Sequence, residues 1–194
     1  MQVEHLAIEG PLLLTPRVFG DDRGFFFESW NQRTFADALG VREEEGPVFR
    51  QDNHSRSSRG VLRGLHYQLE PEPQGKLVRC VAGEIFDVAV DIRRGSPTFG
   101  QWVGATLSES NHGQLWVPVG FAHGFLTLSE SADVLYKASG YWSKACERSI
   151  RWDDPTIGIS WPLDPLGGTT PLLAEKDGAA PFLEEALSAG DVFA

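Results

Sequence analysis

The sequence predicts an all-β fold, either a double-sheet jelly roll or a barrel. Short apolar segments recur between turn signals, and the 21 glycines and 12 prolines are spread throughout the chain. Helix signals are few by comparison. Many short strands in one compact chain are typical of jelly rolls and barrels, which protect their strand edges by pairing or closing sheets. Barrels of this kind can hold a small ligand in their mouth.

Most of the predicted strands lie in the middle of the chain. Residues 76–82 and 84–92 flank Gly83 and are predicted to form a hairpin. Along residues 84–92 one face is apolar and the other carries Asp87 and Asp91, which is the pattern of a half-buried strand. Further strands are predicted over residues 61–67, 100–107, 114–117, 124–128 and 133–138.

Two short helices are predicted at the periphery. Asn31 can cap a helix over residues 32–39, and Gly40 is placed to stop it. Pro181 is suited to begin a second helix that runs to Leu187.

The composition indicates one globular domain over residues 1–194. Hydrophobic residues make up 41% and charged residues 23%, which is ordinary for such a domain. The net charge of −10 argues against non-specific binding to nucleic acid or to an acidic membrane, although a local cluster of cations can still bind an anionic ligand.

The sequence also predicts a cytoplasmic protein without a membrane segment. No apolar run approaches the roughly 20 residues of a membrane helix. The first ten residues lack a secretory pattern. Two cysteines, Cys80 and Cys146, are too few for a disulfide scaffold.

The strongest chemical signal is His66, which follows Arg63 by three residues. An imidazole titrates near neutrality and can accept a proton from a substrate, whereas a guanidinium suits phosphate. The pair therefore suggests chemistry on a phosphorylated small molecule. Strand alternation places the two side chains on opposite faces, and the plainer interpretation is a satisfied core histidine. That interpretation is weakened by the polar neighbours Gln51, Asn53, Gln68 and Lys76.

Two more residues are candidates for chemistry. His123 lies among glycines and aromatic residues, and as a neutral imidazole it can donate a hydrogen bond to a substrate carbonyl. Tyr136 lies on a predicted strand, where a phenol can donate a proton and be recharged from solvent. A packed loop histidine and a rim tyrosine are the plainer alternatives.

Other signals are weaker or negative. Arg23 and Glu28 bracket an aromatic run that a surface salt bridge would also explain, and Lys176 and Asp177 lie in what is ordinarily a solvated turn. The five histidines form no H-x-H or HExxH pattern, so the site is predicted to hold no metal.

Together these motifs resemble one family. The segments DDRGFFFESW, QDNHS, GVLRGLHYQ, QGKLVRC, GEIFDVAVDIRRGSPTFGQW, LWVPVGFAHGFLTLSE, YKASGYW, RWDDPTIGI and EKD occur in order from about Phe19 to Asp177. They are similar to the motifs of dTDP-4-dehydrorhamnose 3,5-epimerases. The resemblance implies a cupin-like double-stranded β-helix (jelly roll) with a few short peripheral helices. It also implies a homodimer that exchanges a strand, with neither metal nor organic cofactor.

The activity that the resemblance implies is cofactor-independent epimerisation. The substrate would be dTDP-4-dehydro-6-deoxy-D-glucose, inverted at carbons 3 and 5 to dTDP-4-dehydro-L-rhamnose. His66 would be the base, Asp177 its partner and Tyr136 the acid. Contacts to the sugar and diphosphate would fall on Arg23, Glu28, Gln51, Asp52, Asn53, Arg63, Gln68, Lys76, His123, Glu147 and Lys176, and contacts to the nucleotide on Phe19, Phe26, Tyr141 and Trp142.

The chain departs from the family pattern at three positions. Ala174 stands where a serine is common, Trp142 where a second tyrosine is common and Lys144 where a proline is common. Tryptophan keeps a flat apolar face on which a base can stack. The missing serine bears on the setting of Asp177.

Three alternative functions stay open on the sequence. The first is an epimerase that acts at carbon 3 alone or carbon 5 alone. The second is a non-catalytic cupin that binds a nucleotide sugar, although such a module has no need of a base and an acid together. The third is a metal-dependent cupin oxygenase, which the missing ligand pair disfavours.

Overall fold

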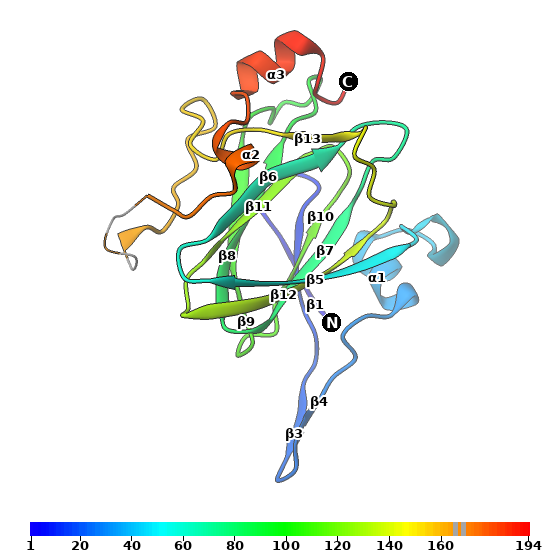
Figure 1. The fold of residues 1–194 in the computed structure, drawn as a ribbon. Coiled ribbons are helices and arrows are strands. Elements are labelled where there is room, and N and C mark those ends of the chain that lie inside the picture. Colours follow the sequence, from blue (N-terminus) through cyan, green and yellow to red (C-terminus); the bar gives the residue numbers. More distant parts are fainter. Residues whose placement is uncertain (165–166, 168–169) are drawn as a thin grey trace.

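The computed structural model describes residues 1–164, 167 and 170–194, and its main body consists of two antiparallel sheets (Figure 1). The six-stranded sheet contains, in spatial order, β1 (Gln2–His5), β2 (Leu12–Thr15), β10 (Gln114–Val117), β7 (Lys76–Ala82), β12 (Ser131–Ala138) and β5 (Gln51–Ser58). The five-stranded sheet contains β13 (Glu147–Ser149), β6 (Leu62–Gln68), β11 (Phe121–Thr127), β8 (Glu84–Asp91) and β9 (Trp102–Ser108). This architecture confirms the predicted all-β, cupin-like jelly roll with few helices.

The two sheets pack face to face around an apolar interior. Buried side chains from both sheets meet there, including Val78 and Val134 from one and Ile85 and Phe125 from the other. Removing these surfaces from water is the main favourable contribution to folding. The interior is therefore mainly apolar, and polar side chains enter it at a few positions.

Helices cover the outer faces of the sheets. Helix α1 (Gln32–Leu39) presses Phe35 against Leu14 and Trp116 on the six-stranded sheet. Helix α3 (Leu183–Ala189) packs Leu183 against the outer side chains of the five-stranded sheet. Two shorter elements, η1 (Glu43–Glu45) and α2 (Glu175–Gly178), complete the set of helices in the described part of the chain, where no helix is long and apolar enough to cross a membrane.

Both predicted helices are present. The Asn31 side chain accepts a hydrogen bond from the backbone N–H of Thr34 at 3.1 Å, and Gly40 ends α1 in the left-handed conformation, so this prediction is confirmed to the residue. The second helix begins at Leu183, two residues after Pro181, and continues to Ala189. The predicted strands are present within a few residues of the expected bounds. The strands β1, β2, β5 and β13 carry no clear apolar alternation and were not predicted, and neither were the short strands β3 (Phe19–Asp21) and β4 (Gly24–Phe26).

The predicted hairpin around Gly83 is wrong. Strand β7 pairs with β10 and β12, whereas β8 pairs with β11 and β9, so the chain crosses from one sheet to the other at this glycine. Gly83 has a φ of +77°, and a Cβ atom there would lie 2.1 Å from the Ser131 carbonyl oxygen. Alternation records which face of a strand is buried and does not identify its partner strand.

The prediction that β8 is half-buried is also wrong. Asp87 and Asp91 have no exposed surface, and their face of the strand points into the space between the sheets. The opposite face, with Val88 and Val90, is buried in a second apolar cluster that includes Leu183 and Ala186 of α3. Carboxylates can be buried in this way when they find hydrogen-bond partners.

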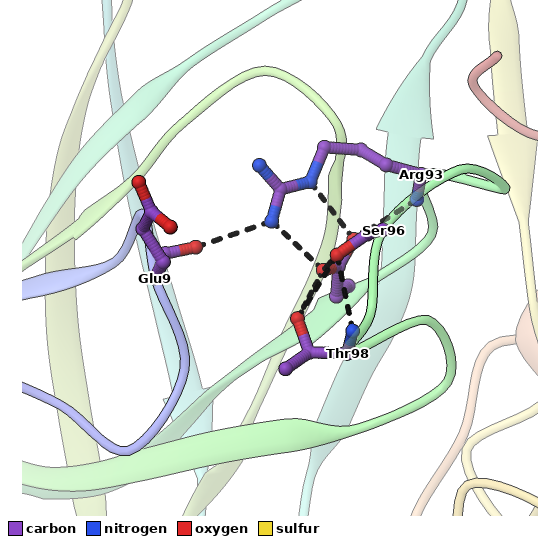
Figure 2. A network of polar contacts seen from close by, with 5 residues as sticks. Glu9, Arg93, Ser96 and Thr98 are labelled. Atoms are coloured by element: carbon purple, nitrogen blue, oxygen red, sulfur yellow. Dashed lines mark hydrogen bonds and ion pairs between the residues drawn. The ribbon is translucent and has the colours of Figure 1, made fainter.

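Asp91 shows how such a carboxylate is accommodated (Figure 2). It accepts two hydrogen bonds from the Arg93 guanidinium, at 2.9 and 2.8 Å, and one each from the hydroxyls of Ser96 and Thr98, at 2.5 and 2.6 Å. Arg93 also donates to the carbonyl of Glu9 at 3.1 Å. Although burial raises the pKa of Asp91, these donors outweigh it and lower the pKa to about 2. The network holds the turn after β8 and ties it to the N-terminal segment.

A two-stranded arm projects from the body of the protein (Figure 1). It consists of β3 (Phe19–Asp21) and β4 (Gly24–Phe26), and all six of its strand residues are exposed. The Phe26 side chain is 71% exposed. An isolated hairpin is marginally stable in water, and a cluster of exposed aromatic side chains commonly marks a contact surface.

We expect Gly83→Ala to lower the free energy of unfolding by about 2 kcal/mol or more, since the added methyl group clashes with the Ser131 carbonyl and the positive φ strains any other residue. Urea denaturation measures the change. Gly95→Ala is the control, because Gly95 has no atom within 4 Å of the added group and no positive φ, and it should change stability by less than about 0.5 kcal/mol. Equal effects of the two substitutions would contradict this account of the sheet crossing.

Candidate active site

A cavity of about 480 Å³ opens between the two sheets. Its walls come from β5, β6, β7, β11, β12 and β13 and from the segment that leads into α2. Nine of the side chains predicted from the sequence line it: Arg63, His66, Lys76, His123, Tyr136, Trp142, Glu147, Lys176 and Asp177. The fold therefore gathers residues that are spread over more than half of the chain.

A bulge in β6 brings Arg63 and His66 to the same cavity. His66 lies opposite His123 on β11, and Arg63 lies opposite Phe125, so three steps along β6 match two along β11. Strict alternation would have put the two side chains on opposite faces, and that expectation is wrong. The extra residue fits because Gly64 runs against β11, where a Cβ atom would lie 2.6 Å from the Cα of Gly124.

His66 and Asp177 form a buried hydrogen-bonded pair. Nε2 of His66 lies 2.6 Å from Oδ1 of Asp177, and the exposed fractions of the two side chains are 24% and 2%. The other carboxylate oxygen accepts from the backbone N–H of Gly64 at 3.5 Å. Because Nε2 carries the hydrogen shared with the carboxylate, Nδ1 of a neutral ring is left with a free lone pair.

The protonation states of this pair suit a base. Burial lowers the pKa of His66 below its ordinary value, against the opposing effect of Asp177, and the charges of Lys76 and Lys176 lower it further. Burial raises the pKa of Asp177, but the hydrogen bonds from His66 and Gly64 outweigh it and keep the pKa below the usual range. At neutral pH the imidazole is therefore neutral and the carboxylate ionised.

Helix α2 positions Asp177. This residue lies in a single helical turn, where its backbone N–H donates to the Ala174 carbonyl at 3.0 Å. The side chain of Ala174, at the N-cap, cannot make the capping hydrogen bond that a serine would make. The contact with His66 is nevertheless intact, so the departure from the family pattern removes a cap without displacing the carboxylate.

Tyr136 reaches the cavity from the opposite sheet. It belongs to β12 of the six-stranded sheet, whereas His66 belongs to β6 of the five-stranded sheet. Burial raises the pKa of the Tyr136 phenol, so the hydroxyl keeps its proton at neutral pH. A proton acceptor and a proton donor thus lie on the two facing layers that enclose the cavity.

Cations gather at this cavity although the whole chain is acidic. Arg63, Lys76 and Lys176 line it, and Glu147 pairs with Lys176 at 3.2 Å. Nε of Arg63 donates to the Ser57 hydroxyl at 2.9 Å, which orients the guanidinium. The local cluster of cations that the net charge left open is therefore present.

Lys76 is the buried member of this group. Its ammonium donates to the carbonyl of His66 at 3.2 Å, and only 9% of the residue is exposed. Burial lowers the pKa of Lys76 to about 8, although the charges of Asp87 and Glu147 act to raise it. At neutral pH this lysine is still mainly cationic.

His123 is held by a carboxylate that the sequence analysis did not assign to the site. Its Nε2 lies 2.6 Å from Oδ1 of Asp87. While a neutral ring donates Nε2–H to this carboxylate, its other nitrogen is an acceptor. His123 therefore donates to a substrate carbonyl, as the sequence suggested, only when the ring carries a second proton.

Several predicted contact residues lie away from the cavity. Phe19, Arg23 and Phe26 are on the projecting arm, where Arg23 pairs with Asp21 at 2.5 Å. Glu28 accepts from the Asn31 side chain at 3.2 Å. These residues do not meet the cavity of their own chain.

Two predicted residues, Gln51 and Gln68, bind the loop that carries Trp142 into the cavity wall. Gln51 accepts from the backbone N–H of Trp142 at 2.9 Å and donates to Asn53 at 2.9 Å. Gln68 donates to the Tyr141 carbonyl at 3.0 Å, and it accepts from the backbone N–H of residue 143 at 2.8 Å. The loop that presents Trp142 is therefore fastened by two glutamines.

Two predicted side chains have surface positions. The Asp52 carboxylate is exposed and pairs with Lys137 at 3.0 Å. The Tyr141 side chain is 56% exposed and is not among the residues that line the cavity.

The walls of the cavity also include residues that the sequence analysis missed: Ser55, Val61, Leu62, Phe125, Leu172, Leu173 and Ala174. Most are apolar and carry no chemical signal. Asp87, which the sequence analysis did not assign to the site, did carry a chemical signal. It is an acid on a strand whose other face is fully apolar, and both faces of such a strand can be buried. In the described part of the chain, no group of three or more histidine, cysteine, aspartate or glutamate side chains is placed to hold a metal ion.

Comparison with known sequences gives one family. A family model described as dTDP-4-dehydrorhamnose 3,5-epimerase matches residues 5–185. A dTDP-4-dehydrorhamnose 3,5-epimerase of Salmonella typhimurium is 58% identical over 187 residues, which cover 96% of this chain and 98% of the relative.

Solved structures of epimerases are also similar to this chain. A dTDP-6-deoxy-D-glucose-3,5-epimerase from Legionella pneumophila, in complex with dTDP-4-keto-L-rhamnose, superposes with a TM-score of 0.90 at 47% identity and covers 99% of this chain and 97% of its own. A 3'-monoepimerase from Streptomyces bikiniensis, in complex with dTDP-quinovose, has a TM-score of 0.86 at 35% identity and covers 96% and 90%.

We expect Asp177→Asn to lower the pKa of His66 further, because the variant removes the negative charge that opposes the effect of burial. NMR titration of the His66 ring measures this. Asp153→Asn is the control, since Asp153 pairs only with Arg151 near the surface and should leave the His66 titration unchanged. An unchanged His66 titration in Asp177→Asn would contradict the pairing described above.

Proposed function

Because the chain belongs to the dTDP-4-dehydrorhamnose 3,5-epimerase family, we propose that His66, Asp177 and Tyr136 carry out its epimerisation at carbons 3 and 5. The chain is an isomerase, and its substrate is dTDP-4-dehydro-6-deoxy-D-glucose, which becomes dTDP-4-dehydro-L-rhamnose. The observation that carries the assignment of roles is the placement of His66 and Tyr136 on facing sheets of one cavity.

Epimerisation needs proton transfer on both sides of the sugar ring. The 4-keto group acidifies the hydrogens on carbons 3 and 5. Nδ1 of His66 takes one of these hydrogens as a proton, and the electron pair of the broken C–H bond forms the enolate. Tyr136 then gives its phenolic proton to the opposite face of the same carbon and is recharged from solvent, while the His66 imidazolium returns its proton to solvent. Asp177 stabilises the imidazolium that forms during the first step.

The enolate oxygen needs a positive partner. Lys76 is mainly cationic at neutral pH, and it approaches from the sheet that faces His66. Removing one donor to a developing oxyanion commonly slows a reaction on the order of 10² to 10³. Lys76 is therefore the main group for this role, and His123 can join it only when its ring carries a second proton.

The nucleotide diphosphate lies toward the mouth of the cavity in this proposal. Arg63 and Lys176 are exposed cations at the rim, and Trp142 presents a flat apolar face. Binding energy gained by these residues, remote from the reacting carbons, can hold the ketosugar in position for proton transfer.

The projecting arm supports a homodimer that exchanges a segment between protomers. Phe19, Arg23 and Phe26 are implied to contact the nucleotide, yet they lie on an exposed hairpin away from their own cavity. We propose that each arm completes the cavity of the partner protomer. This would also cover aromatic surface that a lone chain leaves in water.

The remaining proposals concern the whole chain. We propose that residues 1–194 act as one domain, since the family model spans most of them. We propose the cytoplasm as the compartment, which is supported by the two unpaired, buried cysteine thiols.

We expect the product formed in deuterated water to contain deuterium at carbons 3 and 5. His66→Ala should abolish exchange, with a loss on the order of 10² to 10⁴ in rate, and Tyr136→Phe should keep some exchange while impairing inversion. NMR of the product counts the deuterons. Incorporation at one carbon only would indicate the single-carbon alternative, and binding without exchange a non-catalytic cupin. Full activity in His66→Ala would end the assignment.

We expect His66→Ala and Arg23→Ala to complement each other when mixed after unfolding and refolding. If each arm serves the partner's cavity, half of the dimers are mixed and each carries one intact site, so about a quarter of wild-type activity returns. Activity assays of the mixture and of each variant alone measure this. A mixture no more active than the sum of its parts, or a monomer in sedimentation, would contradict the exchange.

A further inference from the structure

Asp87 is a fully buried carboxylate for which the proposed reaction has no role so far. It lies on β8 with its side chain directed into the space between the sheets, beside Ile85 and Ala89 of the interior core. Burying a carboxylate costs free energy unless both of its oxygens find hydrogen-bond partners. The contacts that Asp87 makes therefore determine what its burial costs.

Its two oxygens have different surroundings. Oδ1 lies 2.6 Å from Nε2 of His123, whereas Oδ2 has no hydrogen-bond partner among the described residues. Asp91, four residues further on the same face, has both oxygens fully engaged by Arg93, Ser96 and Thr98. The burial of Asp91 is therefore explained by the turn that its hydrogen bonds hold, whereas no such turn explains the burial of Asp87.

Strand register places Asp87 at the end of a polar row that begins at the proposed base. His66 on β6 lies opposite His123 on β11, and Asp87 on β8 lies opposite Phe125, one step along the same face from His123. The row therefore reads Asp177, His66, His123, Asp87, with a hydrogen-bonded carboxylate at each end. Asp177 fixes the ring of the base, and Asp87 fixes the second ring in the same way.

Asp87 also acts on Lys76 across the interior. Among the charges that favour the ammonium form of this lysine, Asp87 has the largest effect and Glu147 the next, whereas Lys176 opposes them. The other titratable or charged groups that line the same cavity are Arg63, His66, His123, Tyr136 and Asp177. Without the Asp87 charge, burial would drive the lysine toward its neutral form.

We propose that Asp87 is a positioning residue for the epimerisation: its Oδ1 orients the ring of His123, and its negative charge acts on the Lys76 ammonium from the facing sheet. This rests on the proposed function. Asp87 itself touches no substrate atom, because it is not among the residues that line the cavity. It acts through the two groups that face the 4-keto oxygen in the proposed reaction.

The test compares Asp87→Asn with Asp91→Asn, a matched change on the same face of the same strand. We expect Asp87→Asn to lower kcat by about 10- to 100-fold with KM changed less than about twofold, because only transition-state stabilisation is lost. We expect Lys76, whose pKa burial lowers to about 8, to set an alkaline limb in the pH profile of kcat, and this limb should move to lower pH in Asp87→Asn. Asp91→Asn should lower the melting temperature and leave the position of that limb unchanged.

Further variants separate the possible outcomes. Asp87→Ser, which removes the same charge, replaces Asp87→Asn if the latter does not fold, and Lys76→Arg should abolish the limb near 8 because a guanidinium does not titrate there. The proposal is overturned if the limb persists in Lys76→Arg, or if Asp87→Asn behaves like Asp91→Asn. A wild-type enzyme that exchanges no deuterium would instead overturn the proposed function itself.

Discussion

The hydrogen bond between His66 and Asp177 is the contact on which the site depends. It joins the middle of β6 to a single helical turn that lies 111 residues later in the chain. Because the carboxylate occupies Nε2, the ring presents Nδ1 to the cavity with a free lone pair. The same contact fastens α2 to the sheet, and with it the wall formed by residues 172–174. The wall is held as well by backbone hydrogen bonds of Leu172 with Gly60 and Leu62, so the pair adds a side-chain contact between α2 and the sheet to a segment that the backbone already fastens.

The charged groups that enter this interior have hydrogen-bond partners, although Oδ2 of Asp87 and the Thr127 hydroxyl have none among the described residues. His123 has Asp87, Asp91 has Arg93 with two hydroxyls, and the Lys76 ammonium has a backbone carbonyl. Each arrangement reduces the cost of taking a polar or charged group out of water. Where these partners do not fully offset the cost of burial, the pKa values change. Burial lowers the pKa of His66 and of Lys76 and raises that of Tyr136. Those three directions are the ones that a neutral base, a titratable cation and a protonated acid require.

The jelly roll supplies geometry that a single layer could not. Two facing sheets place His66 and Tyr136 on opposite walls of one cavity, where we propose that they act as base and acid on the two faces of the sugar. Proton transfer to the face opposite the removed hydrogen is the defining step of an inversion. The arm, by contrast, is left exposed by the single chain, and in our proposal its aromatic and basic residues complete the cavity of a second protomer.

The sequence by itself determined the all-β class and helix α1 with its caps, and it identified nine of the side chains that line the cavity, because capping, turn residues and long ordered motifs are local signals. It did not determine strand partners: Gly83 was taken for a hairpin turn when it links two sheets. Nor did it reveal the β6 bulge that turns Arg63 and His66 to one side, or the inward direction of Asp87. Those features depend on register and on packing between distant segments, and only the tertiary structure decides which of several sterically acceptable partners a strand or a buried charge meets.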